Sequence, residues 1–208
     1  MAAVTDLTFP SASGHPMRAA LAVPRATAPR PAVIVIHEIF GLNDDIRRMT
    51  GRFADLGYVA LAPDLYDAGS PRVLCIARTM LALRRKDGPA FADLEAARAW
   101  LAARPEVDPS RTGVAGFCMG GGFALLYAVR APLGAAAVFY GDVPKAAEEL
   151  GVPHDVRIYP AAGHSYMSRH TGLLATLAAH GPMAVGFDAE AEADSWARME
   201  AFFRAHLG

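Results

Sequence analysis

Two kinds of hydrophobic pattern alternate along the chain. Short apolar runs, several of them rich in Val and Ile, predict strands, whereas apolar residues that recur every three or four positions predict helices. The predicted strands cover residues 7–10, 17–23, 32–36, 58–62, 113–117, 135–140 and 156–159. The predicted helices cover residues 43–56, 72–85, 91–103, 120–130 and 189–207. Because such alternation is typical of α/β proteins, we expect a mostly parallel central sheet with helices on both faces.

Composition narrows the class of protein. With 208 residues, of which 53% are hydrophobic and 20% charged, the chain is expected to form a single globular domain over residues 1–208. Its formal net charge of -1 provides no field that would attract nucleic acid or a membrane surface, so neither is an expected partner. Residues 1–10 lack the features of a secretory leader, and no apolar run is long enough to cross a bilayer. The expected location is the cytoplasm.

The two cysteines occupy different contexts. Neither Cys75 nor Cys118 belongs to a CxxC or Cys/His spacing, which argues against a disulfide framework and against a metal site. Cys118, however, is the centre of the segment GFCMG at residues 116–120, which matches the pattern G-x-nucleophile-x-G between a predicted strand and a predicted helix. Glycines are needed there because the turn is tight and strained. The alternative is that Cys118 is only a small core residue.

A cysteine at such a turn is expected to be reactive. The N-terminus of the following helix favours negative charge, so we expect the pKa of Cys118 to be lowered and its thiolate to be favoured. The backbone N–H of Met119 is then a candidate oxyanion donor. Cys75, inside a predicted helix, has no comparable context.

Two further segments supply candidate partners for Cys118. His164 follows the last predicted strand in a loop of small residues, where it is expected to act as the general base. Glu38 follows the apolar run 32–36, where a buried carboxylate is costly unless it has a role or a hydrogen bond. We therefore expect Glu38 to belong to the site, the alternative being an ordinary strand terminator. The loop after it offers Ile39 as a second oxyanion N–H donor and Phe40 as a substrate contact.

Several segments together resemble the dienelactone hydrolase family. They are HEIFGLN at residues 37–43, APDLY at 62–66, GFCMGGGFA at 116–124, FYG at 139–141 and YPAAGHSY at 159–166. The resemblance implies an α/β-hydrolase fold, a Cys-His-Asp triad, hydrolysis of a small ester or lactone through a thioester, and no metal or organic cofactor. It implies that Cys118 is the nucleophile, that His164 is the base and that Glu38 contacts the resting cysteine. Arg169 is the comparable candidate for holding a substrate carboxylate, and Arg72 and Arg78 are looser candidates.

The chain departs from the family pattern after residue 140. The family would place another strand there, followed by a loop with the triad aspartate, but only residues 141–155 connect the two predicted strands. About 30 residues are missing by comparison with the usual size of a βα unit, so the sheet is expected to be one strand shorter. Asp142 is the best remaining acid because it follows a predicted strand. The alternative is that Asp142 caps the next helix.

Three functions fit this pattern. The first is hydrolysis of a small ester or lactone by Cys118. The second is a non-catalytic, hydrolase-like protein that binds a small molecule or a protein partner, which the missing acid motivates. The third is a thiol-dependent acyltransferase, which would pass the acyl group to an alcohol or an amine instead of water. The oligomeric state is left open by the sequence.

Overall fold

A computed structural model describes residues 2–26, 28–67, 69–141, 153–169 and 185–208 of the chain. The described strands are β1 (Val4–Pro10), β2 (Pro16–Ala22), β3 (Arg30–Ile36), β4 (Val59–Pro63), β5 (Val107–Phe117) and β6 (Ala135–Phe139). The described helices are α1 (Asp44–Asp55), α2 (Arg72–Arg85), α3 (Pro89–Ala102), α4 (Met119–Ala128) and α7 (Ala189–Leu207). The sequence pattern thus predicted each of these elements, although β5 begins six residues before the predicted strand 113–117 and β1 begins three residues before the predicted strand 7–10.

One six-stranded sheet in the order β1-β2-β4-β3-β5-β6 forms the centre of the fold. β1 and β2 pair antiparallel, as do β2 and β4, whereas β3 pairs parallel with β4 and β5, and β5 pairs parallel with β6. The sheet is therefore mostly parallel, as expected. Because the carboxyl ends of the parallel strands meet at one edge, the residues that directly follow β3, β4, β5 and β6 lie at the same edge of the sheet.

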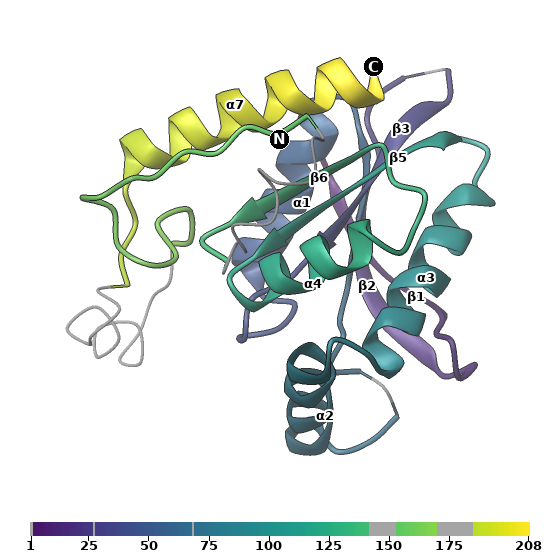
Figure 1. Cartoon of the computed structure of the whole chain (residues 1–208). Coiled ribbons are helices and arrows are strands. Elements are labelled where there is room, and N and C mark those ends of the chain that lie inside the picture. Colours follow the sequence, from purple (N-terminus) through teal and green to yellow (C-terminus); the bar gives the residue numbers. More distant parts are fainter. Residues whose placement is uncertain (1, 27, 68, 142–152, 170–184) are drawn as a thin grey trace.

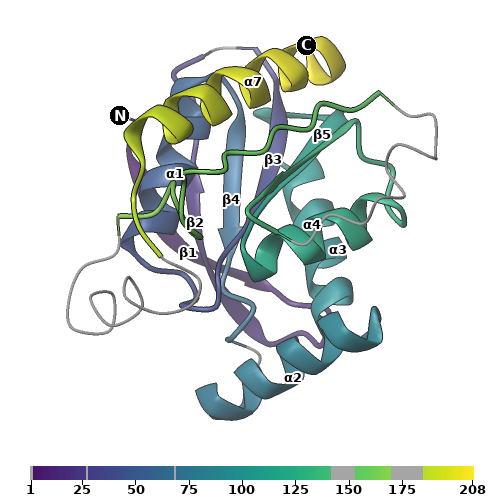
Figure 2. The same cartoon turned by 60° about the vertical axis from the view of Figure 1, so that its left-hand side comes forward.

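Helices cover both faces of the sheet (Figures 1 and 2). On one face, Phe53 of α1 packs with Trp196 and Phe203 of α7, with ring centroids 5.0 Å and 6.2 Å apart. On the other face, Phe91 of α3 packs against Phe123 of α4 at 5.1 Å. Figure 1 shows α2 extending beyond the sheet at the end of α3. The two cores account for the three- to four-residue apolar spacing of these helices.

The prediction of a strand at residues 156–159 is wrong. This segment is described without regular structure, and its Val156 and Ile158 side chains are 53% and 76% exposed. It is tied to α7 instead of to a strand: the Tyr159 hydroxyl donates to Asp194 at 2.7 Å, and Asp155 pairs with Arg198. Figures 1 and 2 show the segment running along α7. Four alternating residues form a strand only when a neighbouring strand pairs with them.

Candidate active site

The turn between β5 and α4 places Cys118 in a strained backbone conformation. Cys118 has φ 53° and ψ -117°, between the end of β5 at Phe117 and the start of α4 at Met119. A Cβ atom on Gly116 would collide with the carbonyl of Gly120, and one on Gly120 would collide with the carbonyl of Ile36. The close approach of these backbones explains why glycine occupies both positions. The turn has the geometry of a nucleophile elbow.

The elbow brings Cys118 to His164. Nε2 of His164 lies 3.0 Å from Sγ of Cys118. The His164 loop is anchored through its backbone, since the N–H of Gly186 donates to the carbonyl of His164 at 3.2 Å. Cys118 is half-buried, whereas Cys75 is 1% exposed. Of the two thiols, only the one at the elbow therefore combines access with a neighbouring base.

The expectation that the pKa of Cys118 is lowered is wrong. Burial raises the pKa of the Cys118 thiol, and the negative charge of Glu38 raises it further. The backbone N–H groups of Met119 and Ile39 hydrogen bond to the sulfur and lower its pKa, but they do not outweigh burial. The resting side chain is therefore a neutral thiol, which can donate its proton to Nε2 of His164.

The same two N–H groups define where an oxyanion would be held. Met119 begins α4, and Ile39 belongs to the loop that follows β3. That loop is fixed by His37, which is fully buried: its Nδ1 lies 2.7 Å from the carbonyl oxygen of Glu38, and the Leu65 N–H donates to its Nε2 at 3.1 Å. Burial lowers the pKa of His37, so its ring is neutral. These contacts fix the loop that contains the Ile39 N–H to the segment that follows β4.

Glu38 is buried at the end of β3, 1% exposed, beside Cys118. Its Oε1 accepts a hydrogen bond of 2.7 Å from the hydroxyl of Ser168. Ser168 in turn lies 3.0 Å from the hydroxyl of Tyr140, at the end of β6. Burial and the charge of Glu38 raise the pKa of Tyr140 well above its usual value, so this phenol is neutral. The Glu38 carboxylate is therefore held by hydroxyl groups.

Sequence reasoning assigned no role to Ser168, Tyr140 or Tyr66. The hydroxyl of Tyr66 lies 3.5 Å from the sulfur of Met119 at the elbow, and burial raises its pKa to about 12. Tyr140 and Tyr66 belong to the segments FYG and APDLY that mark the family, and this was the only signal that could have singled them out. Ser168 follows His164 by four positions and had no such signal.

The candidate substrate contacts lie in two places, the oxyanion loop and the segment that follows His164. Phe40, 48% exposed, is in the oxyanion loop, where its carbonyl accepts a hydrogen bond of 3.3 Å from Arg72. The Arg72 guanidinium also lies over the ring of Tyr66, 5.5 Å from its centroid. Arg169 is engaged with Glu192 at 3.3 Å and lies over Phe187, near the start of α7. Of these two arginines, Arg72 has the contacts nearer the elbow.

The last candidate residue is Asp142, the expected acid partner of His164. Asp142 lies outside the described residues, so the structure does not place it relative to His164. Within the part of the chain that is described, no residue accepts a hydrogen bond from Nδ1 of His164. The described residues also contain no group of three His, Cys, Asp or Glu side chains that could hold a metal ion.

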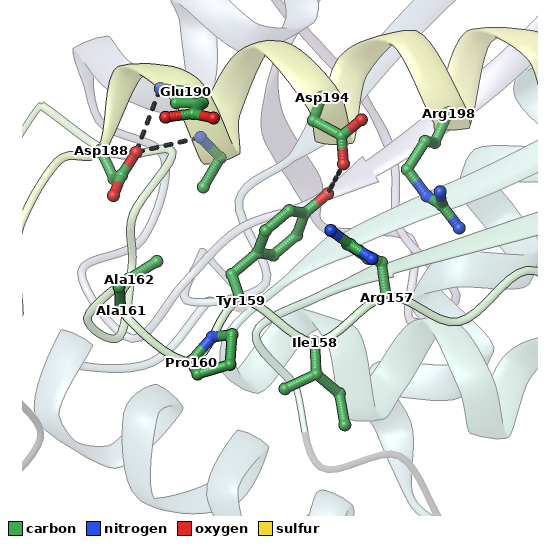
Figure 3. A pocket seen from close by; sticks show the side chains of 11 residues that line it. Arg157, Ile158, Tyr159, Pro160, Ala161, Ala162, Asp188, Glu190, Asp194 and Arg198 are labelled. Atoms are coloured by element: carbon green, nitrogen blue, oxygen red, sulfur yellow. Dashed lines mark hydrogen bonds between the residues drawn. The ribbon is translucent and has the colours of Figure 1, made fainter.

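A hollow of about 500 Å³ lies beside the His164 loop (Figure 3). Residues 157–162 line one side of it, and the first half of α7, including Asp194 and Arg198, lines the other. Cys118, Glu38 and His164 do not line it. The hollow is therefore separate from the candidate active site.

An α/β-hydrolase fold is defined by the mostly parallel sheet, the elbow at Cys118 and a histidine, His164, that follows β6, the last described strand. The model of the dienelactone hydrolase family matches residues 17–151 and 142–207. The chain therefore belongs to the dienelactone hydrolase family. The two matches meet at residues 142–151, in the connection that the sequence shows to be short. Among the described residues, no helix is both long enough and apolar enough to cross a membrane.

Known proteins support this assignment. A relative from Escherichia coli K12 is 38% identical over 148 residues, which are 68% of this chain and 54% of that protein. A relative from Saccharolobus solfataricus is 27% identical over 263 positions, covering 94% of this chain and 96% of the relative. Both carry the name "Putative carboxymethylenebutenolidase". The chain thus spans about half the length of the E. coli protein.

Solved structures agree with the fold. The crystal structure of a dienelactone hydrolase-like promiscuous phosphotriesterase from metagenomic libraries superposes with a TM-score of 0.80 at 28% identity, covering 100% of each chain.

Proposed function

We propose that the protein hydrolyses a small ester or lactone, with Cys118 as the nucleophile and a thioester as the intermediate. The observation that supports this most is the 3.0 Å contact between Sγ of Cys118 and Nε2 of His164 at a strained elbow. Family membership supports the reaction class. The two N–H groups that hydrogen bond to the sulfur support acyl transfer, since they lie where negative charge would develop.

The first half of the reaction forms the thioester. Sγ attacks the substrate carbonyl carbon while its proton passes to Nε2 of His164. The carbonyl oxygen becomes an oxyanion, which the N–H groups of Met119 and Ile39 hold. When this intermediate collapses, the bond to the leaving oxygen breaks and His164 returns the proton to that oxygen. An ester releases an alcohol, whereas a lactone opens to a hydroxyacyl thioester.

The second half restores the enzyme. His164 removes a proton from a water molecule, whose oxygen attacks the thioester carbonyl. Collapse of the second oxyanion breaks the C–S bond, the carboxylic acid leaves, and the proton on His164 returns to the sulfur. No oxidant, reductant or further cofactor is consumed. A neutral resting thiol suits this cycle because the proton that is needed for the leaving group is already present.

The surroundings of the elbow favour a small substrate that is partly apolar and carries a carboxylate. Ile39 and Phe40 are 45% and 48% exposed and offer apolar surface next to the oxyanion donors. Arg72, at the carbonyl of Phe40 and 3.7 Å from Asp64, is the candidate partner for the carboxylate nearer the elbow. Arg169 is the second candidate and would have to exchange its contact with Glu192 for the substrate. An Asp142 carboxylate that reached Nδ1 of His164 would complete a triad.

Turnover on a panel of aryl esters and lactones, with and without a carboxylate, tests this proposal. We expect hydrolysis by the wild-type protein, and a rate at the level of the uncatalysed reaction for Cys118→Ala. Cys75→Ala is the matched control and is expected to keep its turnover. Equal rates for the wild type and Cys118→Ala would contradict the assignment of the nucleophile.

The same assay separates the two alternatives. A binding protein without catalysis, which the short connection at residues 141–155 motivates, would raise its thermal midpoint with a lactone but would not hydrolyse it. An acyltransferase would form more ester or amide than free acid when an alcohol or an amine is added. Hydrolysis as the main outcome in the presence of added alcohol supports the first function.

A further inference from the structure

Three segments meet at a buried chain of hydrogen bonds. Glu38 comes from the end of β3, Tyr140 follows β6, and Ser168 belongs to the loop that also contains His164. The hydroxyl of Ser168 donates to Oε1 of Glu38 at 2.7 Å. Because a serine hydroxyl has a single proton, the 3.0 Å contact between Ser168 and Tyr140 is a donation from the tyrosine hydroxyl. The chain of donors therefore runs from Tyr140 through Ser168 to Glu38.

Ser168 is held firmly enough to position its partner. It is 2% exposed, and its N–H donates to the carbonyl of Ser165 at 2.9 Å, in a turn where Ser165 has φ 61°. The preceding carbonyl, of Met167, accepts a hydrogen bond of 2.8 Å from Arg48 of α1. The hydroxyl of Ser168 thus has little freedom to turn away from Glu38. A fixed donor of this kind fixes the carboxylate that accepts from it.

The charge of Glu38 bears directly on the nucleophile. Glu38 raises the pKa of Cys118, in addition to the effect of burial. The other titratable groups that face Cys118 are His164, in contact with the sulfur, and Tyr66, whose pKa of about 12 keeps it neutral near pH 7. Next to Glu38, Tyr140 and the buried His37 are also neutral. Among these groups, Glu38 is the one that supplies negative charge.

We propose that Ser168 is a positioning residue that holds the Glu38 carboxylate at the end of β3, next to the elbow that carries Cys118. This inference rests on the proposed function, and it adds to it a means by which the His164 loop controls the thiol. The loop that supplies the base also supplies the group that fixes the carboxylate. A displacement of this loop would therefore change the protonation of the nucleophile.

The rate of alkylation of Cys118 by iodoacetamide, measured across pH, tests the proposal. Trypsin separates the two cysteines into the peptides 112–130 and 73–78, so mass spectrometry follows Cys118 alone. In Ser168→Ala we expect the midpoint of the pH profile to fall by about half a unit to one unit, because the carboxylate is no longer fixed. This raises the rate at pH 7 by about threefold or more. Ser168→Thr keeps the hydroxyl and is expected to stay near the wild type.

A double mutant excludes a merely structural role. Glu38→Gln removes the charge, so adding Ser168→Ala to it is expected to cause no further shift of the midpoint. An unchanged midpoint in Ser168→Ala, or the same shift with and without Glu38→Gln, would overturn the proposal. If Ser168→Ala does not fold, Tyr140→Phe removes the hydroxyl that contacts both Ser168 and Glu38, and is expected to shift the midpoint in the same direction; no shift would overturn the proposal equally.

Alkylation requires no turnover, so this experiment is independent of the assay for hydrolysis. A shifted midpoint in a protein that hydrolyses nothing would support the role of Ser168 and contradict the proposed function. Hydrolysis with an unshifted midpoint would support the proposed function and contradict the role of Ser168.

Discussion

Nε2 of His164 lies 3.0 Å from Sγ of Cys118, although the two residues are 46 positions apart in the sequence. The contact joins the elbow after β5 to a loop that leads toward α7. Burial of the sulfur raises the pKa of Cys118, so its resting side chain is a thiol. The proposed reaction therefore needs a base at the moment of attack.

Replacement of His164 should remove most of the activity. His164→Gln removes the imidazole that takes the proton of the sulfur and activates water in the proposed reaction, so we expect the turnover rate to fall by about 10²- to 10⁴-fold. The measurement is the hydrolysis rate of the best ester or lactone of the panel. His206→Gln, at the end of α7, is the matched control. A loss of less than tenfold in His164→Gln would contradict the role of this base.

Replacement of Cys118 by serine should not restore the reaction. An alcohol depends more strongly on its base than a thiol does, and within the described residues nothing orients His164 through Nδ1. We expect Cys118→Ser to lose about 100-fold or more in turnover, although the side chain is nearly isosteric. Activity equal to that of the wild type would show that sulfur is not required.

The raised pKa of Cys118 has a consequence for stability. A thiol whose pKa is higher in the folded state than in the unfolded state stabilises the fold below the unfolded pKa, and this contribution is lost as the pH rises through the folded pKa. We therefore expect the free energy of unfolding of the wild type, relative to Cys118→Ala, to fall between pH 7 and pH 10. Urea denaturation at both pH values measures it. A relative gain at pH 10 would show that the shift has the opposite sign.

Gly120 should tolerate no side chain. A Cβ atom there would meet the carbonyl oxygens of Ile36 and His37, which are backbone atoms and cannot move aside easily. We expect Gly120→Ala to lower the free energy of unfolding by about 2 kcal/mol or more, and to reduce hydrolysis by displacing the N–H of Met119. Gly186→Ala, where a Cβ atom would meet nothing within 4 Å, is the control and is expected to change stability by less than about 0.5 kcal/mol.

The sequence predicted those parts of the protein that depend on local pattern. The helix expected at residues 72–85 is α2, and the apolar run 32–36 lies in β3, because amphipathic spacing and β-branched residues act within a short segment. The same holds for the elbow, where two glycines surround Cys118. These features needed no knowledge of distant contacts.

The features that could not be predicted depend on contacts between residues that are far apart in the sequence. The segment 156–159 alternates like a strand, but it lies along α7, where Tyr159 bonds to Asp194. The sign of the pKa shift at Cys118 depends on how deeply the sulfur is buried, which local sequence does not encode. The hydrogen bond from Ser168 to Glu38 spans 130 positions, and no motif links the two.

The central claim is that Cys118 forms a covalent acyl intermediate. Rapid acid quench during hydrolysis of an activated aryl ester, followed by trypsin digestion and mass spectrometry, tests it most directly. The account predicts an acyl mass increment on the peptide 112–130, labile to hydroxylamine as a thioester is, and absent in Cys118→Ala. An increment that persists in Cys118→Ala, or that appears on the peptide 73–78 instead, would contradict it.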